Sequence, residues 1–551
     1  MKRFVVYSLL GLSLLTSACQ DDFLDRVPLD ELVDETYWEN EEQLRLATDA
    51  CYAYLKAKNT VDMENLGDNT IWPSVTDYQR IASGNFTNDI GALNNEWTGS
   101  YDGIRRCNAF LANYQRAEVT DPARKEALAA EVRVIRAYLY SYLTTFYGDV
   151  QLVTTPLEID DPLVYGTRTP RAEVVDFMLK ELDEAAAALP AAIPTGANLG
   201  RISRGAALAL KARVALQNQR YAAAEQAAKA VMDLNVYQLY TAGGTANAYR
   251  NLFTYAGKLA AGANKETILA RTHLADISMH NLSREIQVPD QNARWNPTKS
   301  LVDSYLCSDG LPIEKSPLYK DTTYADVFKN RDPRMVQTIL QPGAAWGGRF
   351  DGNPQNTNPA VYTTPKFRSD RRGSVTITGY YFTKYVELST VGQVSRDAND
   401  IHLIRLAEVL LIYAEARLEQ NKLTQADVDL TINKLRQRVG MRAMDLAELT
   451  TNGLDVRTEL RRERRVELAL EGQRYFDILR WQQGNLLAED VKGMKKAWAR
   501  SAADVANQPT DANGFIIVNR NRTFTASRNY LWPMPLVQLE RNPNLGQNPG
   551  W

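Results

Sequence analysis

Histidine is scarce in this chain of 551 residues, and its scarcity narrows the chemistry that the protein can perform. The three histidines, His273, His280 and His402, are widely spaced, and no HExxH pattern occurs. The four cysteines form no CxxC pair, so the sequence contains no recognisable set of zinc ligands. We therefore expect no metal site and no cofactor, and a histidine-based catalytic centre has few candidates.

The sequence also lacks an excess of either charge and any long hydrophobic run. Its 64 Lys and Arg residues nearly balance its 66 Asp and Glu residues, and the two signs are interspersed. This balance gives no electrostatic basis for binding nucleic acid. No segment approaches the ~20 apolar residues that a transmembrane helix needs. The 44% hydrophobic composition is that of an ordinary globular protein with a large core.

The cysteines leave one pairing question open. Cys51 and Cys107 could form a disulfide in an oxidising compartment, whereas a free, buried thiol is the usual state of such residues. The distance between two thiols depends on the fold, so their spacing in the sequence does not decide between these states.

The most informative stretch is RTELRRERRVELALEGQRYFDILRW at residues 457–481, whose periodicity predicts one long helix. Asp455 precedes it and is a candidate N-cap. Charged residues surround the apolar face, so we expect arginines and glutamates to pair with other helices; a solvated, charged helix is the alternative. Gly472 costs this helix about 0.5–1 kcal/mol relative to alanine, which a close approach by another backbone segment would offset.

This stretch carries a long spaced pattern. Its members are Glu463, Arg464, Glu467, Leu468, Glu471, Gly472, Arg474, Asp477, Ile478, Arg480 and Trp481. The pattern resembles the signature of the SusD/RagB family, surface lipoproteins that capture nutrients for an outer-membrane transporter. Residues 530–551 resemble the ending of that family. The resemblance implies a mostly α-helical, SusD-like fold with irregularly spaced tetratricopeptide-type hairpins and a loop-rich ligand-binding region with little β-structure.

The first residues are typical of a secretory signal peptide. A positively charged start and a short apolar run lead to LTSAC at residues 15–19, which resembles a lipoprotein cleavage site. We therefore expect a signal peptide at 1–18, lipidation at Cys19 and a tether over 19–38; ordinary cleavage beside a chance cysteine is the alternative. The acidic run that follows resembles the mark of surface-exported lipoproteins, which implies a lipid-anchored protein exposed on the outer membrane.

Residues 39–551 are expected to form a single SusD-like domain. Its expected parts are helical hairpins at about 39–262 and 400–485, a loop-rich insertion at about 263–399 and an extended tail at about 515–551. The clearest hairpins are 203–234 and 403–439, because small residues at helical spacing let two helices pack closely. Prolines in the tail remove backbone donors, which favours extended chain there.

Two loop-rich stretches, 67–97 and 263–395, concentrate aromatic residues among polar ones. Binding a sugar requires flat rings for its C–H faces and planar polar groups for its hydroxyls. The candidate ligand-binding residues are Trp72, Asp77, Arg80, Asn94, Trp97 and Trp295. A packing role is the alternative for each tryptophan, because most tryptophans are largely buried.

The resemblance implies a non-enzymatic protein that captures oligosaccharides and delivers them to a SusC-like TonB-dependent barrel. A RagB-like protein that captures peptides is the alternative, because some relatives take peptides. A glycoside hydrolase would need two carboxylates about 5–10 Å apart across a cleft, and no hydrolase motif stands out. A purely structural role in a transporter complex is the third reading of the sequence.

Overall fold

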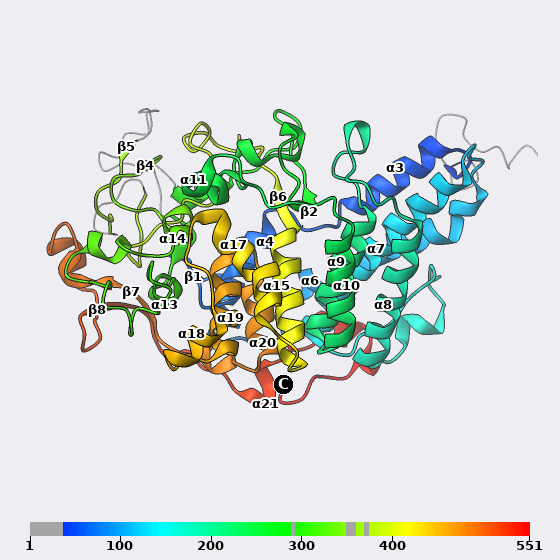
Figure 1. The fold of residues 1–551 in the computed structure, drawn as a ribbon. Helices are drawn as coiled ribbons and strands as arrows, with labels where there is room; N and C mark the ends of the chain where they lie inside the picture. The colour runs from blue at the N-terminus through cyan, green and yellow to red at the C-terminus, as the bar shows by residue number, and fades with distance from the viewer. Residues whose placement is uncertain (1–36, 288–292, 349–359, 368–373) are drawn as a thin grey trace, which may run out of the picture.

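The computed structural model in Figure 1 describes residues 37–287, 293–348, 360–367 and 374–551. The expected signal peptide at 1–18, the lipidation site Cys19 and residues 19–36 of the tether lie outside the described residues. Within the described ranges, no helix combines the length and the apolar character needed to cross a membrane.

The N-terminal part of the molecule is built of helices, most of them where the periodicity predicts. They are α3 (Glu41–Tyr52), α4 (Asn59–Asp62), α5 (Asp77–Ala82), α6 (Gly91–Asn113), α7 (Pro122–Tyr147), α8 (Arg171–Ala188), α9 (Arg204–Gln217), α10 (Tyr221–Asp233) and α11 (Gly244–Asn251). Local signals set their starts: Asn40 and Gln43 form a capping box at α3, and Asp121 caps α7. Helix α7 is central, since all but one residue from Leu128 to its end are buried.

A second helical block packs beside the first. It contains α15 (Leu406–Glu419), α16 (Gln425–Leu430), α17 (Ile432–Val439), α18 (Leu446–Thr451), α19 (Val456–Glu467) and α20 (Arg474–Arg480). Helices α9, α10 and α15 lie side by side in Figure 1, and buried alanines such as Ala209, Ala228 and Ala414 let them approach closely. The predicted hairpins are thus confirmed, except that a strand takes up the first residues of the second hairpin and Thr431 interrupts its second helix.

The prediction of one helix over residues 457–481 is wrong, because α19 and α20 are separate helices. Asp455 caps α19 as predicted, accepting a hydrogen bond from a backbone N–H. The chain leaves helical geometry at Leu470 (φ 65°) and Gly472 (φ 71°). A Cβ at Gly472 would lie 2.3 Å from the carbonyl oxygen of Thr60. Because glycine has no Cβ, Gly472 can adopt a left-handed φ and also allow the close backbone approach that the sequence indicated.

Residues 263–399 alternate short elements with irregular chain. The described elements are β2 (Thr267–Arg271), α12 (Leu282–Gln287), β3 (Asn296–Pro297), α13 (Lys299–Ser304), α14 (Pro333–Thr338), β4 (Ala345–Trp346) and β5 (Ala360–Val361). The strands of the described chain form antiparallel pairs: β1 (Thr70–Ile71) with β3, β2 with β6 (Ile401–Arg405), β4 with β5, and β7 (Val491–Lys495) with β8 (Phe515–Asn519). Because β6 runs directly into α15, the β2–β6 pair ties the loop-rich part to the helical block.

Two hydrophobic cores correspond to these two parts. The first fills mainly the helical blocks, and the second lies mainly in the loop-rich part but also takes in helical residues such as Tyr249, Val439 and Val466. The second core is rich in aromatic side chains, including Tyr305, Tyr324, Trp346, Tyr362, Tyr380 and Tyr381. Large rings fill the uneven spaces between irregular segments, where small residues would leave cavities.

The tail beyond residue 515 contains helical turns, which corrects the expectation of extended chain throughout. Helices α21 (Ala526–Asn529) and α22 (Leu536–Arg541) lie within it. Trp532 anchors the tail by stacking on Phe146, with ring centroids 3.9 Å apart and planes 4° apart. Trp551 packs on Phe86 with ring centroids 4.7 Å apart.

Cys51, Cys107 and Cys307 are buried, free thiols. The disulfide considered for Cys51 and Cys107 is therefore not formed in this structure, although the two thiols contact each other between α3 and α6. Burial, and secondarily the neighbouring Cys51 thiol, raises the pKa of Cys107.

Candidate functional site

The candidate ligand-binding residues fall into two groups in the structure. Trp72 and Trp295 contact each other edge to face, with ring centroids 5.3 Å apart. Trp72 directly follows β1 and Trp295 directly precedes β3, so the pairing of these strands brings the two rings together. The other four candidates lie on α5 and α6.

The structure differs from the expectation that three tryptophans offer flat faces. Trp72 is half-buried, whereas Trp295 has 0% and Trp97 only 4% of its surface exposed. Trp97 packs on Tyr101 and Tyr147, with ring centroids 4.9 and 5.1 Å away. A ring enclosed by other side chains has no face for a sugar, so Trp97 and Trp295 pack the interior in this structure.

Asp77, Arg80 and Asn94 hold the chain around α5 and α6. Asp77 Oδ2 accepts a hydrogen bond from the Ala92 N–H at 3.0 Å, which joins the start of α5 to the start of α6. Asn94 Oδ1 accepts one from Gln538 Nε2 at 2.8 Å, which fixes the tail on α6. Arg80 keeps 51% of its side chain exposed, with Nη1 3.8 Å from Asp77 Oδ1. Of these three, Arg80 has the head group most available to a ligand.

Charged residues distant in the sequence surround the Trp72–Trp295 pair. The Arg294 guanidinium lies 5.6 Å from the centroid of the Trp72 ring, and Lys58 Nζ lies 5.0 Å from that of Trp295. Glu285 joins the two cations, 2.7 Å from Arg294 Nη1 and 2.9 Å from Lys58 Nζ. Sequence reasoning missed these charged residues, although Arg294 directly precedes Trp295, because no periodicity connects them.

The two indole rings also carry donors without partners. Within the described part of the chain, Nε1–H of Trp72 and of Trp295 makes no hydrogen bond, although both atoms are buried. A buried donor without a partner costs about 1–3 kcal/mol. The Trp72 surface thus combines a partly exposed ring with the 42% exposed side chain of Arg294, which suits a hydroxylated ring.

A buried ion network lies between the helical and loop-rich parts. Arg405 Nη1 donates to Glu266 at 2.8 Å and to Glu467 at 2.7 Å, and its Nε donates to Glu471 at 2.8 Å. Glu467 also binds Arg334 from α14, at 3.0 Å. The predicted pairing of arginines and glutamates across helices is therefore confirmed.

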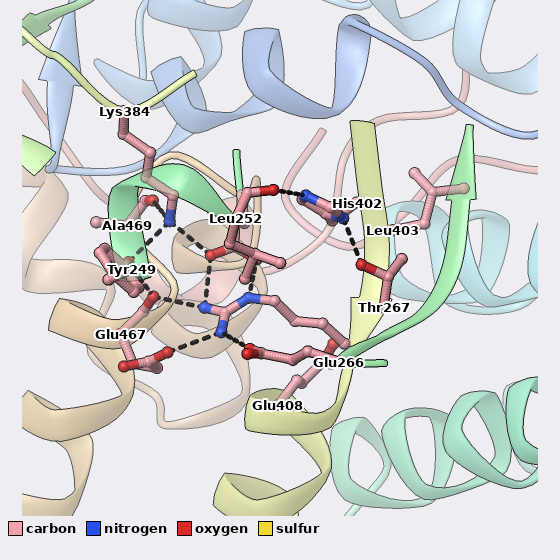
Figure 2. Close-up of polar contacts among 12 residues, drawn as sticks. Tyr249, Leu252, Glu266, Thr267, Lys384, His402, Leu403, Glu408, Glu467 and Ala469 are labelled. Carbon is pink, nitrogen blue, oxygen red and sulfur yellow. Dashed lines mark hydrogen bonds and ion pairs between the residues drawn. The ribbon is translucent and has the colours of Figure 1, made fainter. Parts of the chain in front are cut away.

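Lys384 is the titratable residue of this network that most resembles a catalytic group. Burial lowers its pKa to about 8. However, its Nζ donates to Tyr249 Oη at 2.9 Å and to Ala469 O at 2.7 Å (Figure 2). It also donates to Glu471 Oε1 at 2.6 Å, and its side chain has 0% exposure. With its three N–H groups engaged and no access from solvent, Lys384 is a structural cation.

Three cavities of the described chain are separate from the Trp72 surface. One of about 720 Å³ lies between α10, α15 and α17, and one of about 490 Å³ lies between α8, α9 and α20. A third, of about 380 Å³, lies between α13, α19 and β7. Trp72 lines none of the three.

Two protein-family models match this chain, one in its C-terminal half and one in its N-terminal half. The family model described as the SusD family matches residues 266–551. The chain belongs to the SusD family. A second model, described as "Starch-binding associating with outer membrane", matches residues 22–216.

Relatives of this SusD-family chain match it along most of its length. SusD-like protein P2 of Formosa agariphila is 23% identical over 100% of both chains, and a SusD-like protein of Bacteroides ovatus is 23% identical over 85% of this chain and 81% of its own. The crystal structure of a SusD-like carbohydrate binding protein from Bacteroides fragilis, 28% identical, has a TM-score of 0.79 and covers 93% of this chain and 100% of its own. A laminarin binding SusD-like protein, 21% identical, has a TM-score of 0.66 with coverage of 93% and 100%. The predicted mostly helical, SusD-like fold is confirmed.

Proposed function

We propose that this SusD-family protein is a lipoprotein of the cell surface that captures oligosaccharides and delivers them to a SusC-like TonB-dependent transporter in the outer membrane. The observation that carries the proposal is the fold shared with the 28% identical carbohydrate binding protein of Bacteroides fragilis over 93% of this chain. The second family model, described as starch-binding and associated with the outer membrane, supports the same function.

The Trp72 surface is the proposed contact for the sugar. Its partly exposed ring offers an apolar plate, and the guanidinium of Arg294, whose side chain is 42% exposed, supplies donors for hydroxyl groups. Arg80 is a further candidate contact, because its head group is exposed. In this proposal Trp97 and Trp295 support the surface from within.

Calorimetric titration against neutral oligosaccharides and against a set of short peptides tests the proposal. We expect saturable binding of at least one oligosaccharide, reduced by roughly tenfold or more in Trp72→Ala and Arg294→Ala, since central contacts carry most binding energy. Tyr165→Ala, which removes a ring that is 57% exposed elsewhere on the surface, should leave the affinity unchanged. Binding of peptides alone would replace the oligosaccharide proposal with the RagB-like one.

In this proposal the protein binds its ligand without catalysing a reaction of it. The central carboxylates Glu463, Glu467 and Asp477 are each held by buried arginines, which leaves them poorly placed for acid–base chemistry. Prolonged incubation with the bound oligosaccharide should leave its chain length unchanged by mass spectrometry. Turnover that disappears when cleft carboxylates are replaced would make the protein a hydrolase.

The proposed anchor is an acylated Cys19, and the proposed partner is a TonB-dependent barrel. Several acyl chains would hold the protein at the membrane without a spanning helix. Labelled palmitate should enter the wild-type protein and Cys307→Ala but not Cys19→Ala. A barrel should co-purify with the protein from detergent-solubilised outer membranes; unlabelled protein or purification without a barrel would contradict the respective proposal.

A further inference from the structure

A small cavity beside α19 is lined mainly by arginines. It has a volume of about 180 Å³ and receives Arg461, Arg462, Arg465 and Arg474, with Trp481 at its side. Arg465 follows Arg461 by four residues and Arg462 by three, which are the spacings at which side chains of α19 are neighbours. No side chain that lines this cavity is acidic.

The two most buried of these arginines share one carboxylate. Asp68 Oδ2 lies 3.1 Å from Arg465 Nη2, while Asp68 Oδ1 lies 2.6 Å from Arg474 Nε. The side chains of Arg465 and Arg474 are only 11% and 6% exposed. Burial and the neighbouring guanidinium groups of Arg474 and Arg462 lower the pKa of Arg465 to about 10. Positive charge at this point therefore exceeds what Asp68 neutralises.

Arg461 is the least compensated of the four. Its Nη2 lies 3.7 Å from Glu419 Oε1, and the same oxygen accepts a hydrogen bond from Arg457 Nε at 3.1 Å. Its Nε is buried and has no hydrogen-bond partner in the described chain. The guanidinium lies 4.8 Å from the centroid of the Trp481 ring, which holds it at the cavity wall.

Donors remain on the other three arginines as well. Arg462 engages Glu459 through Nε and Nη2, Arg465 uses Nε and Nη2 for Asn69 and Ser300, and Arg474 uses Nε and Nη2 for Asp68. The remaining Nη1 of each makes no hydrogen bond within the residues that the structure describes. Guanidinium groups bind tetrahedral oxyanions strongly, since several N–H donors can meet one charged group.

We propose that this cavity binds one tetrahedral oxyanion, sulfate or phosphate, either free or as an ester on an uncharged carrier. The volume corresponds to roughly six water molecules at about 30 Å³ each, which is enough for the oxyanion and too small to enclose an oligosaccharide. The adjoining 380 Å³ cavity shares Arg462 and Arg465 but also contains Asp303, Glu489 and Asp490. Those carboxylates would repel a polyanion, so the site favours a single anionic group. The proposal is independent of the glycan-binding function.

Calorimetric titration of the full-length protein with sodium sulfate, at an ionic strength held constant with sodium chloride, tests the site. We expect saturable binding of one sulfate per chain. The double variant Arg461→Gln, Arg462→Gln should weaken it by roughly tenfold or more, because it removes charge-assisted hydrogen bonds. Arg442→Gln is the control: Arg442 is an exposed arginine that pairs with Glu448 and does not line the cavity. Its affinity for sulfate should equal that of the wild type.

A second titration distinguishes the two sources of the oxyanion. Tighter binding of galactose 6-sulfate than of sulfate, with no binding of galactose at this site, would assign an ester on a carrier; tighter binding of sulfate would assign the free ion. Circular dichroism and the unliganded melting temperature establish that the variants are folded. The proposal fails if sulfate does not bind saturably, or if the double variant and Arg442→Gln lose affinity equally. A lower melting temperature in the double variant with unchanged sulfate affinity would also refute it.

Discussion

In helices α9, α10 and α15 the backbone satisfies its own hydrogen bonds, so side chains have only to pack, and buried alanines suffice. In residues 263–399 side chains must also supply hydrogen bonds to the backbone. Thr376 Oγ1 accepts from the N–H groups of Thr378 and Gly379 at 3.2 and 3.1 Å, and Arg331 donates to backbone carbonyls of its neighbours. Irregular chain can therefore be buried only where such partners are available.

The ion network is where these two kinds of structure meet. Arg334 comes from the loop-rich part, whereas Arg405 and Arg438 come from the helical block, and all three bind Glu467. Glu467 and Glu471 come from the helical block and Glu266 from the loop-rich part, so carboxylates of both parts neutralise these arginines. Docking of the two parts and neutralisation of these charges are thus one event.

The largest expected effect on stability comes from removing the carboxylate of Glu467, which binds arginines from both parts. Glu467→Gln leaves three buried arginines without their shared anion and should lower the free energy of unfolding by about 3–5 kcal/mol. The control is Glu448→Gln on the exposed Arg442 pair, whose side chains are each 51% exposed, and it should cost less than about 1 kcal/mol. Urea denaturation measures both. Equal losses would show that the network contributes no more than a surface pair.

Lowering the pH should weaken the same network. Although burial alone raises the pKa of Glu471, Arg405 and Lys384 lower it to about 2, against an ordinary value of 4.5. Because the folded pKa is the lower one, the stabilisation is complete above pH 4.5 and is lost as the pH falls toward 2. This carboxylate should contribute about 3 kcal/mol to that loss. Urea denaturation at several pH values from 7 to 2.5 gives the free energy of unfolding at each pH. This free energy should fall less steeply with decreasing pH in Glu471→Gln than in the wild type; an equal fall would contradict the assignment.

Disturbing the close backbone approach at Gly472 should lower the free energy of unfolding by less than the changes to the ion network, but by a measurable amount. Gly472→Ala combines a left-handed φ of 71° with a Cβ placed 2.3 Å from the Thr60 carbonyl oxygen. We expect a loss of about 2 kcal/mol or more in the free energy of unfolding. Gly514→Ala has a φ of 81° but no atom within 4 Å of its added Cβ, so it isolates backbone strain. Similar losses in the two variants would rule out a role for the contact.

The smallest effect tests the loop-rich part itself. Thr376→Val keeps the shape of the side chain but removes the hydroxyl that accepts two backbone N–H groups, and should cost about 1–2 kcal/mol. Thr144→Val removes a hydroxyl that donates to the Tyr140 carbonyl within α7, and should cost less. Thermal denaturation of the two variants measures the difference. A larger loss for Thr144→Val would reverse the contrast drawn between irregular and helical chain.

Signals between residues close in the sequence were sufficient to predict most helices and to recognise the family. Asp455 and Asn40 begin helices because their side chains accept backbone hydrogen bonds within a few residues. The spaced charges of α19 and α20 indicated buried pairing, and Gly472 indicated a close backbone approach. These features depend on neighbours along the chain or on one residue's own conformational range, so they can be recognised without coordinates.

Contacts between distant residues were decided only by the tertiary structure. The predicted helix is interrupted after Glu467, where Leu470 and Gly472 adopt left-handed φ values and Gly472 lies against Thr60. Trp97 is buried and Trp72 half-exposed because of what packs around each ring, which no local pattern records. The amino-acid sequence thus determined the helices and the family, whereas burial and charge pairing depended on which remote segments fold against each other.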